Sequence, residues 1–573
     1  MTAGINIEAA LELHRSGRVQ EACTIYAILL QAEPGSAVAL QGLATAHAQR
    51  GDFVVAVELF DRALKLKPDY AEAHANRGNV LRCLARFEEA LECYHRATEL
   101  KPVFAEAYNS RGVVLRDLKR LEEALANHER AIEIKPDYAN AWMNRGIVLR
   151  EMGRYQEALS SYEQVIEMRP EDAQTFNYQG MVLYRLERYE EALASYRQAI
   201  RLRPDYAEAH YHHSLALRET LRVTEAVESC DRAIQVRPSY AEAWWNRAEL
   251  LILAGDYPRG WRTFSWRWRS AEYGKVLRQF VQPLWDGTED IAGKTLLVTL
   301  DGGFGDTLQF CRYVSLVVQR GADVILEVQA GLLTLMQGSF DNVCIITNGQ
   351  RLPAFDCSCP LMNLPGAFAL AMKDIPARLP YLQAPRKQVE TWVRRLGTRT
   401  RPRIGLVWSG STEHSNDRQR SMTLATMAAL LDCDAEFHCL QKQVRDVDRQ
   451  AIVDLPIHTW EEELSNFSET AGLIMALDLV ISVDTSVAHL AGALGRPVWV
   501  MLPHVPDMRW LLERDDSPWY PEIMRLFRQP SRGAWPRVIA RVSEELNRFI
   551  QSQSPPGAEI SSPPIPPAMA ANF

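Results

Sequence analysis

Apolar positions in the first half of the chain recur at helical spacing inside a longer period of 34 residues. Each period has a bulky position, a small position four residues later and an alanine twelve residues after that. The bulky position holds Tyr108, Trp142, Phe176 and Trp244, with His74 and His210 in two periods; the small one holds Gly78, Gly112, Gly146, Gly180, Ser214 and Ala248; the alanines are Ala90, Ala124, Ala158, Ala192 and Ala226. Small residues on facing helices permit close approach, so the pattern predicts a solenoid of stacked helix pairs.

Proline marks the end of each period without drift in the spacing, at Pro34, Pro68, Pro102, Pro136, Pro170, Pro204 and Pro238. With the bulky and small positions, this spacing resembles the tetratricopeptide repeat (TPR). We expect about eight repeats, from near Ile5 to a degenerate last unit over residues 242–269. That last unit carries Trp261, Trp266 and Trp268, which we interpret as a hydrophobic joint to the next domain.

After Trp285 short β-branched runs alternate with helical stretches, which is typical of a parallel, doubly wound sheet. One set is predicted from strand 295–299, a helix from Thr307 to about Arg320, and strand 324–328. A second set has strands 403–408, 436–440, 479–483 and 497–502, with a helix at 486–494. We therefore expect four parts: repeats over 1–270, one Rossmann-like lobe over 271–390, a second over 391–551, and a disordered, Pro-rich tail over 552–573.

Charge and composition restrict the partners. The chain has 573 residues, a net charge of −8 and 47% hydrophobic residues, so a nucleic-acid binder with a broad basic surface is not expected. The N-terminus lacks a secretory signal pattern, and the most apolar stretch, 477–502, contains charges, so no transmembrane segment and a cytoplasmic location are expected. The pair Cys357 and Cys359 has no second cysteine pair at zinc spacing, which disfavours a metal site.

A glycine-rich loop, Asp301–Thr307, joins the first strand to its helix. Its backbone N–H groups and the positive end of the helix would face an anion, although a tight turn alone explains the glycines equally well. Asp306 would repel that anion unless it is needed as a base.

A second motif spans 483–495, where a strand ends at Val483 and a helix begins near Ser486. Thr485 or Ser486 would cap the helix, and its free N–H groups would hold a phosphate. Two plainer interpretations stay open: Asp484 acts only as an N-cap, and His489 is a core histidine satisfied by backbone groups.

With Gly305-Asp306 in the first lobe and Asp484-Thr485-Ser486 with His489 in the second, residues 296–548 resemble the heptosyltransferase-like glycosyltransferases of family 9, which have the two-lobed GT-B fold. Joined to the repeats, the architecture is distantly similar to O-GlcNAc transferase. The resemblance implies that Asp306 is the general base and that Gly305 and the four second-lobe residues bind the donor.

Three further candidates rest on position. Ser409 follows a predicted strand, where small residues permit a phosphate to approach. Lys442 follows another strand and resembles the phosphate-binding lysine of O-GlcNAc-type enzymes, although surface lysines are common. The segment 416–421 supplies either an arginine to the diphosphate or a solvated turn.

No metal or other cofactor is expected. The other glycosyltransferase fold has an Asp-x-Asp metal motif, and its pattern is also present here at Asp432 with Asp434 and at Asp446 with Asp448. Two-lobed enzymes, however, use helix dipoles and basic side chains instead of a metal. In the repeats, Asn76, Asn144 and Asn246 match part of the asparagine ladder that grips peptides in O-GlcNAc transferase, whereas Ser110, Tyr178 and His212 interrupt it.

These features favour an inverting, metal-independent glycosyltransferase that moves a sugar from a nucleotide-diphosphate donor. The acceptor, a protein or alternatively a glycan, would be positioned by the TPR groove. The alternative is an interaction scaffold whose transferase region is catalytically silent.

Overall fold

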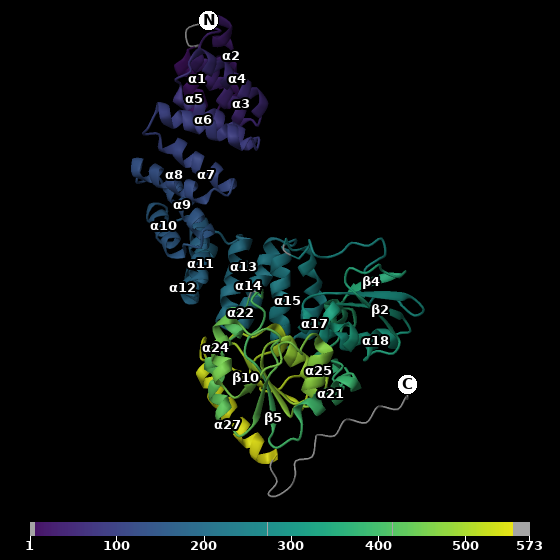
Figure 1. Cartoon of the computed structure of the whole chain (residues 1–573). Helices are drawn as coiled ribbons and strands as arrows, with labels where there is room; N and C mark the ends of the chain where they lie inside the picture. The colour runs from purple at the N-terminus through teal and green to yellow at the C-terminus, as the bar shows by residue number, and fades with distance from the viewer. Residues whose placement is uncertain (1–5, 272, 415, 554–573) are drawn as a thin grey trace. The chain divides into compact units, whose positions relative to one another are not determined.

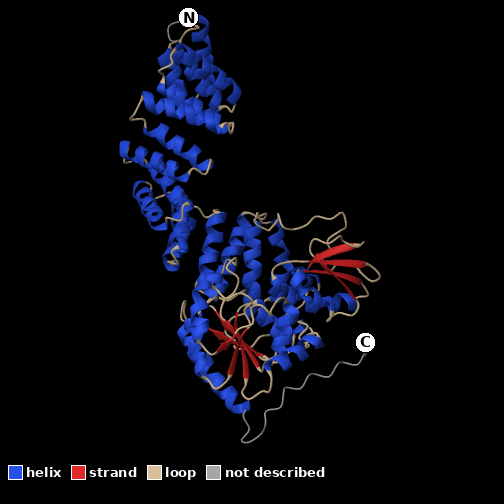
Figure 2. Cartoon of the chain, viewed as in Figure 1, coloured by secondary structure: helices blue, strands red, loops and turns tan. Residues whose placement is uncertain are grey.

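The computed structural model describes residues 6–271, 273–414 and 416–553, which form two compact units, Met1–Thr220 and Leu221–Phe573. The first unit is helical and the second contains the sheets (Figures 1 and 2). This order confirms the predicted fold class, helical repeats followed by an α/β region. Of the tail predicted at 552–573, Ser552 and Gln553 end a helix, and the remainder lies outside the described residues.

The first unit is built from antiparallel helix pairs. Its helices are α1 (Ile7–Arg15), α2 (Val19–Ala32), α3 (Ala37–Gln49), α4 (Phe53–Leu66), α5 (Ala71–Cys83), α6 (Phe87–Leu100), α7 (Ala105–Asp117), α8 (Leu121–Ile134), α9 (Ala139–Glu151), α10 (Tyr155–Met168), α11 (Ala173–Arg185), α12 (Tyr189–Leu202) and α13 (Ala207–Glu219). The repeat continues in the second unit with α14 (Val223–Val236), α15 (Ala241–Leu253) and α16 (Tyr257–Phe264). Helices α1–α16 make eight pairs, the number that the sequence predicts.

In four repeats the small position is a glycine that lies under an aromatic ring of the second helix, at Gly78, Gly112, Gly146 and Gly180. A Cβ on Gly146 would lie 2.6 Å from the ring of Tyr162, and one on Gly180 would lie 2.5 Å from Tyr196. Any larger residue would therefore force the paired helices apart. The alanines facing this contact, such as Ala158 and Ala192, have no exposed surface.

One turn inside each repeat was not anticipated. The residue that links the two helices has a positive φ every 34 residues, at Gly17, Gly51, Ala85, Lys119, Gly153 and Glu187 in the first unit. This left-handed conformation ends the first helix of the pair and is one that glycine adopts without strain. The second helix ends just before the recurring proline, because the residue before proline is disfavoured in the helical region.

His128 occupies the position that Tyr94, Tyr162 and Tyr196 hold in neighbouring repeats, and it is fully buried above Gly112. Its Nδ1 lies 3.0 Å from Oδ1 of Asn109, whereas Nε2 has no partner among the described residues. Burial, and then the nearby Arg116, lower the pKa of His128 to about 3. Between about pH 6.5 and pH 3 the histidine is protonated in the unfolded chain and neutral in the folded chain. The free energy of unfolding therefore decreases as the pH falls through this range.

We expect His128→Tyr to raise the thermal midpoint, and to raise it more at pH 4.5 than at pH 7, because tyrosine stays neutral in this core. The gain at pH 4.5 should exceed the gain at pH 7 by about 2.5 kcal/mol. Thermal unfolding at the two pH values measures it. His95→Tyr, at a histidine whose side chain is 59% exposed, is the matched control and should leave the pH difference unchanged. An equal effect of His128→Tyr at both pH values would contradict this account.

The second unit holds two parallel sheets and their covering helices. The remaining helices are α17 (Phe304–Phe310), α18 (Val314–Gln319), α19 (Leu333–Gln337), α20 (Leu364–Ala367), α21 (Arg386–Leu396), α22 (Asp417–Arg420), α23 (Leu424–Met427), α24 (Asp446–Asp454), α25 (Phe467–Met475), α26 (Ser486–Ala493) and α27 (Trp535–Gln553). The strands are β1 (Thr295–Thr299), β2 (Asp323–Val328), β3 (Val343–Thr347), β4 (Cys357–Pro360), β5 (Arg403–Val407), β6 (Glu436–Cys439), β7 (Ile457–His458), β8 (Leu479–Val483), β9 (Val498–Leu502) and β10 (Met524–Arg528).

The first sheet has the order β3-β2-β1-β4 and the second the order β10-β9-β8-β5-β6-β7, with parallel pairing throughout. Read from β7, the second sheet has the 3-2-1-4-5-6 order of a doubly wound nucleotide-binding sheet. Its central strands β5 and β8 are fully buried because helices cover both faces, as expected for apolar strands such as Leu479–Val483. Within the described ranges, no helix combines the length and the apolar character needed to cross a bilayer.

The compact units divide at residue 220, whereas the sequence placed the end of the repeats at 270. The reason is that α16 packs on the α/β region: the ring of Trp261 meets the ring of Phe310 edge-on at 5.6 Å. Trp268 donates from Nε1 to Asn363 at 3.4 Å. Trp266 instead stacks on Trp244 at 5.2 Å, inside the repeat. Two of the three predicted joint tryptophans therefore contact the α/β region.

Candidate functional site

The carboxyl ends of β1, β5 and β8 carry the loops that the sequence singled out. In both sheets the strand order reverses beside one of these strands, between β1 and β4 and between β5 and β8. Loops at such a switch point splay apart and leave room for a ligand. The two sheets lie in one compact unit, so their loops can be compared directly.

Asp306 lies in the first turn of α17, which begins at Phe304, three residues before the predicted start. Its Oδ2 accepts a hydrogen bond from the N–H of Gly303 at 2.7 Å, which caps the helix. Gly302 has φ 87°, and a Cβ there would lie 2.4 Å from Oδ2 of Asp306. The loop thus requires glycine at 302 in order to hold the carboxylate against the helix start.

The turn of Asp306 lies directly against the second motif. A Cβ on Gly305 would lie 3.2 Å from Cδ2 of His489 and 3.6 Å from Cα of Ser486. Helix α17 of the first sheet therefore packs on α26 of the second at the residue where glycine permits the closest approach. The two segments that the sequence predicted as base and donor site are brought together.

Arg509 joins these two segments, and the sequence analysis did not single it out. It lies in a 3₁₀ turn, Met508–Trp510, and its side chain is 12% exposed. Nη2 donates to Oδ1 of Asp306 at 2.8 Å, and Nε donates to Oδ1 of Asp507 at 2.7 Å. Nη1 lies 3.1 Å from Oε1 of Gln309 and 3.4 Å from Nε2 of His489. Although burial opposes the charge, Asp507, Asp306 and Asp484 raise the pKa of Arg509 well above its ordinary value, so it is a permanent cation.

His489 is buried but is satisfied by side chains rather than by backbone groups. Nδ1 lies 2.9 Å from the hydroxyl of Tyr520, and the ring stacks on Trp510 at 5.2 Å. An arginine can only donate, so Nε2 accepts from Arg509 and the proton belongs on Nδ1. Burial, and then Arg509, lower the pKa of His489 well below its ordinary value, so the ring is neutral.

Helix α26 begins without a side-chain cap. Thr485 is its N-cap residue, not Asp484, and the Thr485 hydroxyl lies 3.0 Å from that of Ser482 instead of bonding the helix. The side chain of Asp484 is 15% exposed; burial raises its pKa and Arg509 opposes the rise. No side-chain cap therefore occupies the backbone N–H groups at the start of this helix, at Ser486, and its positive end can receive an anion.

Ser409 and Lys442 contact different partners and do not form one group of donor ligands. Ser409 is buried; its N–H donates to Oε1 of Gln441 at 3.0 Å, and its hydroxyl accepts from Nε2 of Gln441 at 3.1 Å. Gln441 thereby fixes the loop after β5. Lys442 is exposed and donates from Nζ to the carbonyl of Ser465 at 3.2 Å.

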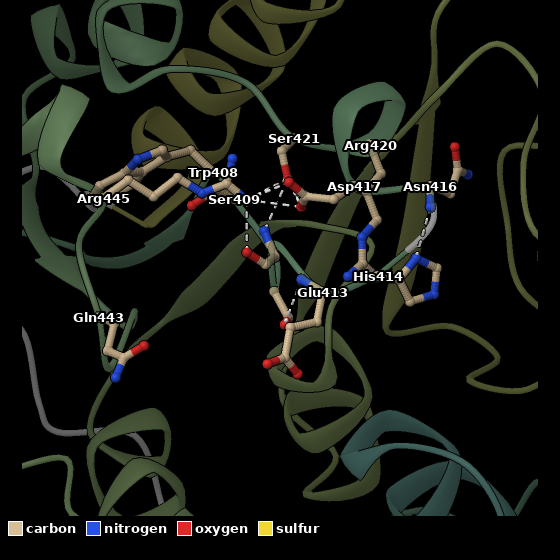
Figure 3. Close-up of polar contacts among 12 residues, drawn as sticks. Trp408, Ser409, Glu413, His414, Asn416, Asp417, Arg420, Ser421, Gln443 and Arg445 are labelled. Atoms are coloured by element: carbon tan, nitrogen blue, oxygen red, sulfur yellow. Dashed lines mark hydrogen bonds and ion pairs between the residues drawn. The ribbon is translucent and has the colours of Figure 1, made fainter. Parts of the chain in front are cut away.

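A polar network orders the residues that follow Ser409. Figure 3 shows Arg445 reaching toward Asp417 and Ser421. Arg445 bonds both carboxylate oxygens of Asp417 at 2.8 Å and the carbonyl of Gly410 at 2.7 Å. Arg420 is half-buried over Gly410 and donates from Nη1 to the carbonyl of Asp484 at 3.0 Å. The structure thus brings one arginine of the segment 416–421 to the start of α26.

The two aspartate pairs that imitate a metal motif do not converge. Asp448 is buried and accepts from Trp408 Nε1 at 2.9 Å and from the N–H of Leu424 at 2.8 Å. The side chain of Asp446 is fully exposed, and that of Asp434 is 81% exposed. Among the described residues no group of three or more His, Cys, Asp or Glu side chains is placed to hold a metal ion.

The predicted asparagines differ in their surroundings. Asn76 and Asn144, in the first unit, are half-buried, and Asn144 donates to Oδ1 of Asn109 at 3.0 Å. Asn246, in the second unit, is 5% exposed and donates to Sγ of Cys230 at 3.4 Å. Such burial does not favour a peptide contact for Asn246.

Comparisons with known proteins agree with this division of the chain. Profiles of tetratricopeptide repeats match residues 44–82, 71–104, 103–171, 143–207, 179–238 and 211–260. A curated relative, protein FlbA of Caulobacter vibrioides, is 25% identical over 334 residues, which are 53% of this chain and 55% of that protein. The chain thus spans about half the length of the curated relative that it matches.

Solved structures similar to the chain include the TPR protein YrrB, at 25% identity and a TM-score of 0.30, which covers 33% of this chain and 96% of that one. PilF of Pseudomonas aeruginosa has 21% identity and a TM-score of 0.34, and covers 37% of this chain and 97% of that one.

The profile of glycosyltransferase family 9 (heptosyltransferase) matches residues 464–501, which contain α25, β8 and α26. The chain therefore carries tetratricopeptide repeats through its N-terminal half and, in its second sheet, a segment similar to family 9 glycosyltransferases.

Proposed function

We propose that this chain is an inverting glycosyltransferase of the GT-B type that takes a sugar from a nucleotide-diphosphate donor. The observation that supports it most is the close contact between the two motifs, where a Cβ on Gly305 would lie only 3.2 Å from Cδ2 of His489. A base on one side and a helix start on the other are what such a transfer needs. The match to family 9 falls on the segment with that helix start.

In this proposal Asp306 takes the proton of the acceptor hydroxyl. The start of α26 receives the diphosphate, and Arg420, on the carbonyl of Asp484, supplies positive charge beside it. The departing diphosphate is stabilised by these fixed donors without a metal ion. The acceptor is a protein segment, or alternatively a glycan, held by the TPR helices of the first unit, where Asn76 and Asn144 are candidates for contacting it.

Thermal shift with a panel of nucleoside diphosphates tests the proposal. A ligand present at about 100 times its dissociation constant stabilises the chain by about 2.7 kcal/mol. A shift with one base and not with the others would also identify the nucleotide. No shift with any member of the panel would favour the alternative, a TPR interaction scaffold with a silent transferase region.

Metal independence makes a separate prediction. Because arginines and a helix start replace the cation, turnover with an excess of EDTA should equal turnover in untreated buffer to within about twofold. Initial rates of diphosphate release measure it. Activity lost to the chelator and restored by manganese would show that a metal takes part.

A further inference from the structure

The proposed mechanism assigns no role to Arg509, although its side chain contacts both Asp306 in the first motif and His489 in the second. Each of its nitrogens has a different partner. Nε is bonded to Asp507, Nη1 to Gln309 and His489, and Nη2 to Asp306. The contact with Asp306 is thus the one that ties the predicted base to this cation.

The anchoring of Arg509 does not depend on Asp306. Asp507 accepts from both Nε and the backbone N–H of Arg509, at 2.7 and 3.0 Å, and the carbonyl of Arg509 accepts from Nε1 of Trp519 at 2.9 Å. Nη2 can therefore change its partner while Nε and the backbone keep the guanidinium in place. A terminal nitrogen needs only a small rotation to exchange one oxygen for another.

The cation also lies beside the start of α26. It touches His489, one turn into that helix, and its charge acts on Asp484, which precedes it. A diphosphate at this helix start would bring oxygens that compete with Oδ1 of Asp306 for Nη2. Phosphate oxygens and carboxylates are the two anions that a guanidinium binds best.

We propose that Arg509 is shared between the base and the donor: the diphosphate takes Nη2 from Asp306, and the freed Oδ1 becomes the proton acceptor. Donor binding thereby activates the base. This inference rests on the proposed function, and it assigns to Arg509 a contact with the leaving group.

The chemical step balances without another reactant. The acceptor oxygen forms a bond to the anomeric carbon of the sugar while its proton passes to Oδ1 of Asp306. The bond between the anomeric carbon and the diphosphate oxygen breaks, and its electron pair leaves with the diphosphate. Arg509, relieved of Asp306, faces the negative charge that develops there.

The inference predicts that Asp306→Asn binds nucleoside diphosphate more tightly than the wild type, because the neutral amide no longer competes for Nη2. We expect a gain of about 5- to 10-fold in affinity, the size of a typical coupling between two sites. Arg509→Met should weaken binding by about 10-fold or more, and in Asp306→Asn/Arg509→Met the gain from Asp306→Asn should vanish.

Isothermal titration calorimetry of the full chain decides the matter, with the nucleoside diphosphate found in the thermal-shift panel and the matching monophosphate. The monophosphate should show a smaller gain in Asp306→Asn. Arg514→Met removes an arginine whose ion pair with Asp516 is partly exposed, and serves as the matched control without effect on binding.

Two failures are distinguishable. If the wild type binds no nucleoside diphosphate, the proposed function falls, and this inference falls with it. If the wild type binds and Asp306→Asn binds equally or more weakly, Arg509 only joins the two segments, and the inference alone is overturned. Should Arg509→Met not fold, Asp306→Asn decides, because asparagine has the shape of aspartate.

Discussion

Asp306→Asn is expected to lower the rate of sugar transfer by about 10²- to 10⁴-fold, the contribution of a positioned general base. Asparagine keeps the shape of the side chain and can still accept from the N–H of Gly303, so α17 keeps its cap. It cannot take a proton from the acceptor hydroxyl. The measurement is the initial rate of nucleoside diphosphate release at saturating donor and acceptor.

Asp516→Asn is the control for this change, because the Asp516 side chain is 63% exposed and pairs only with Arg514 in the contacts described. It should leave the rate within about twofold, as expected for an exposed pair. Wild-type turnover in Asp306→Asn would remove Asp306 from the role of base. We expect donor affinity to be preserved or raised in this variant, and because the rate is measured at saturating donor, lost turnover would not reflect lost binding.

The repeats could be predicted closely from the sequence because their signals are local and recur. A glycine at the small position is explained by one ring above it, as Gly146 and Tyr162 illustrate. The left-handed turn was missed because half of the repeats fill it with residues that give no signal, such as Lys119 and Glu187. Position 119 adopts φ 62° because its helices are held by the neighbouring repeats.

In the α/β region the central strands were predicted and the edges were not. Strands β1 and β8 occupy the residues expected, since buried parallel strands are continuous apolar runs. Strand β4 is short, contains two cysteines and ends at Pro360, which is tolerated because it lies at the sheet edge. Strand β10, also at an edge, carries Arg525 and Arg528, so it lacks an apolar run.

The contact between the Gly305-Asp306 turn and the segment of Ser486 and His489 could be anticipated, because ligand-binding loops gather at the carboxyl ends of parallel strands. Arg509 could not. It lies on an irregular segment after β9, where neither periodicity nor a glycine turn marks a site. The sequence offered one signal. Arg509 lies two residues after Asp507, which has the opposite charge, and directly before Trp510, a large aromatic residue that is fully buried.

A second large effect is expected at the ion pair that connects the last repeat to the Asp306 loop. Nη2 of Arg267 lies 2.5 Å from Oδ2 of Asp301, and their side chains are 3% and 4% exposed. Arg267 comes from a 3₁₀ turn, Ser265–Arg269, directly after α16, and stands over the rings of Phe264 and Trp268 at 4.2 and 4.4 Å. Asp301 is the first residue of the glycine-rich loop and also accepts from the N–H of Met362 at 3.3 Å.

Asp301→Ala should lower the free energy of unfolding by about 3–5 kcal/mol, because it leaves a buried guanidinium without its counter-charge. Burial already lowers the pKa of Arg267, which shows how poorly this environment tolerates the charge. Chemical denaturation of the full chain measures the loss, and Asp516→Ala, at an exposed pair, should cost at most about 1 kcal/mol. Replacing both partners, Arg267→Met/Asp301→Leu, should recover most of the stability, since no buried charge is left unpaired. If the double variant is no more stable than Asp301→Ala, the loss of stability comes from the packing of the loop itself and not from the unpaired charge of Arg267.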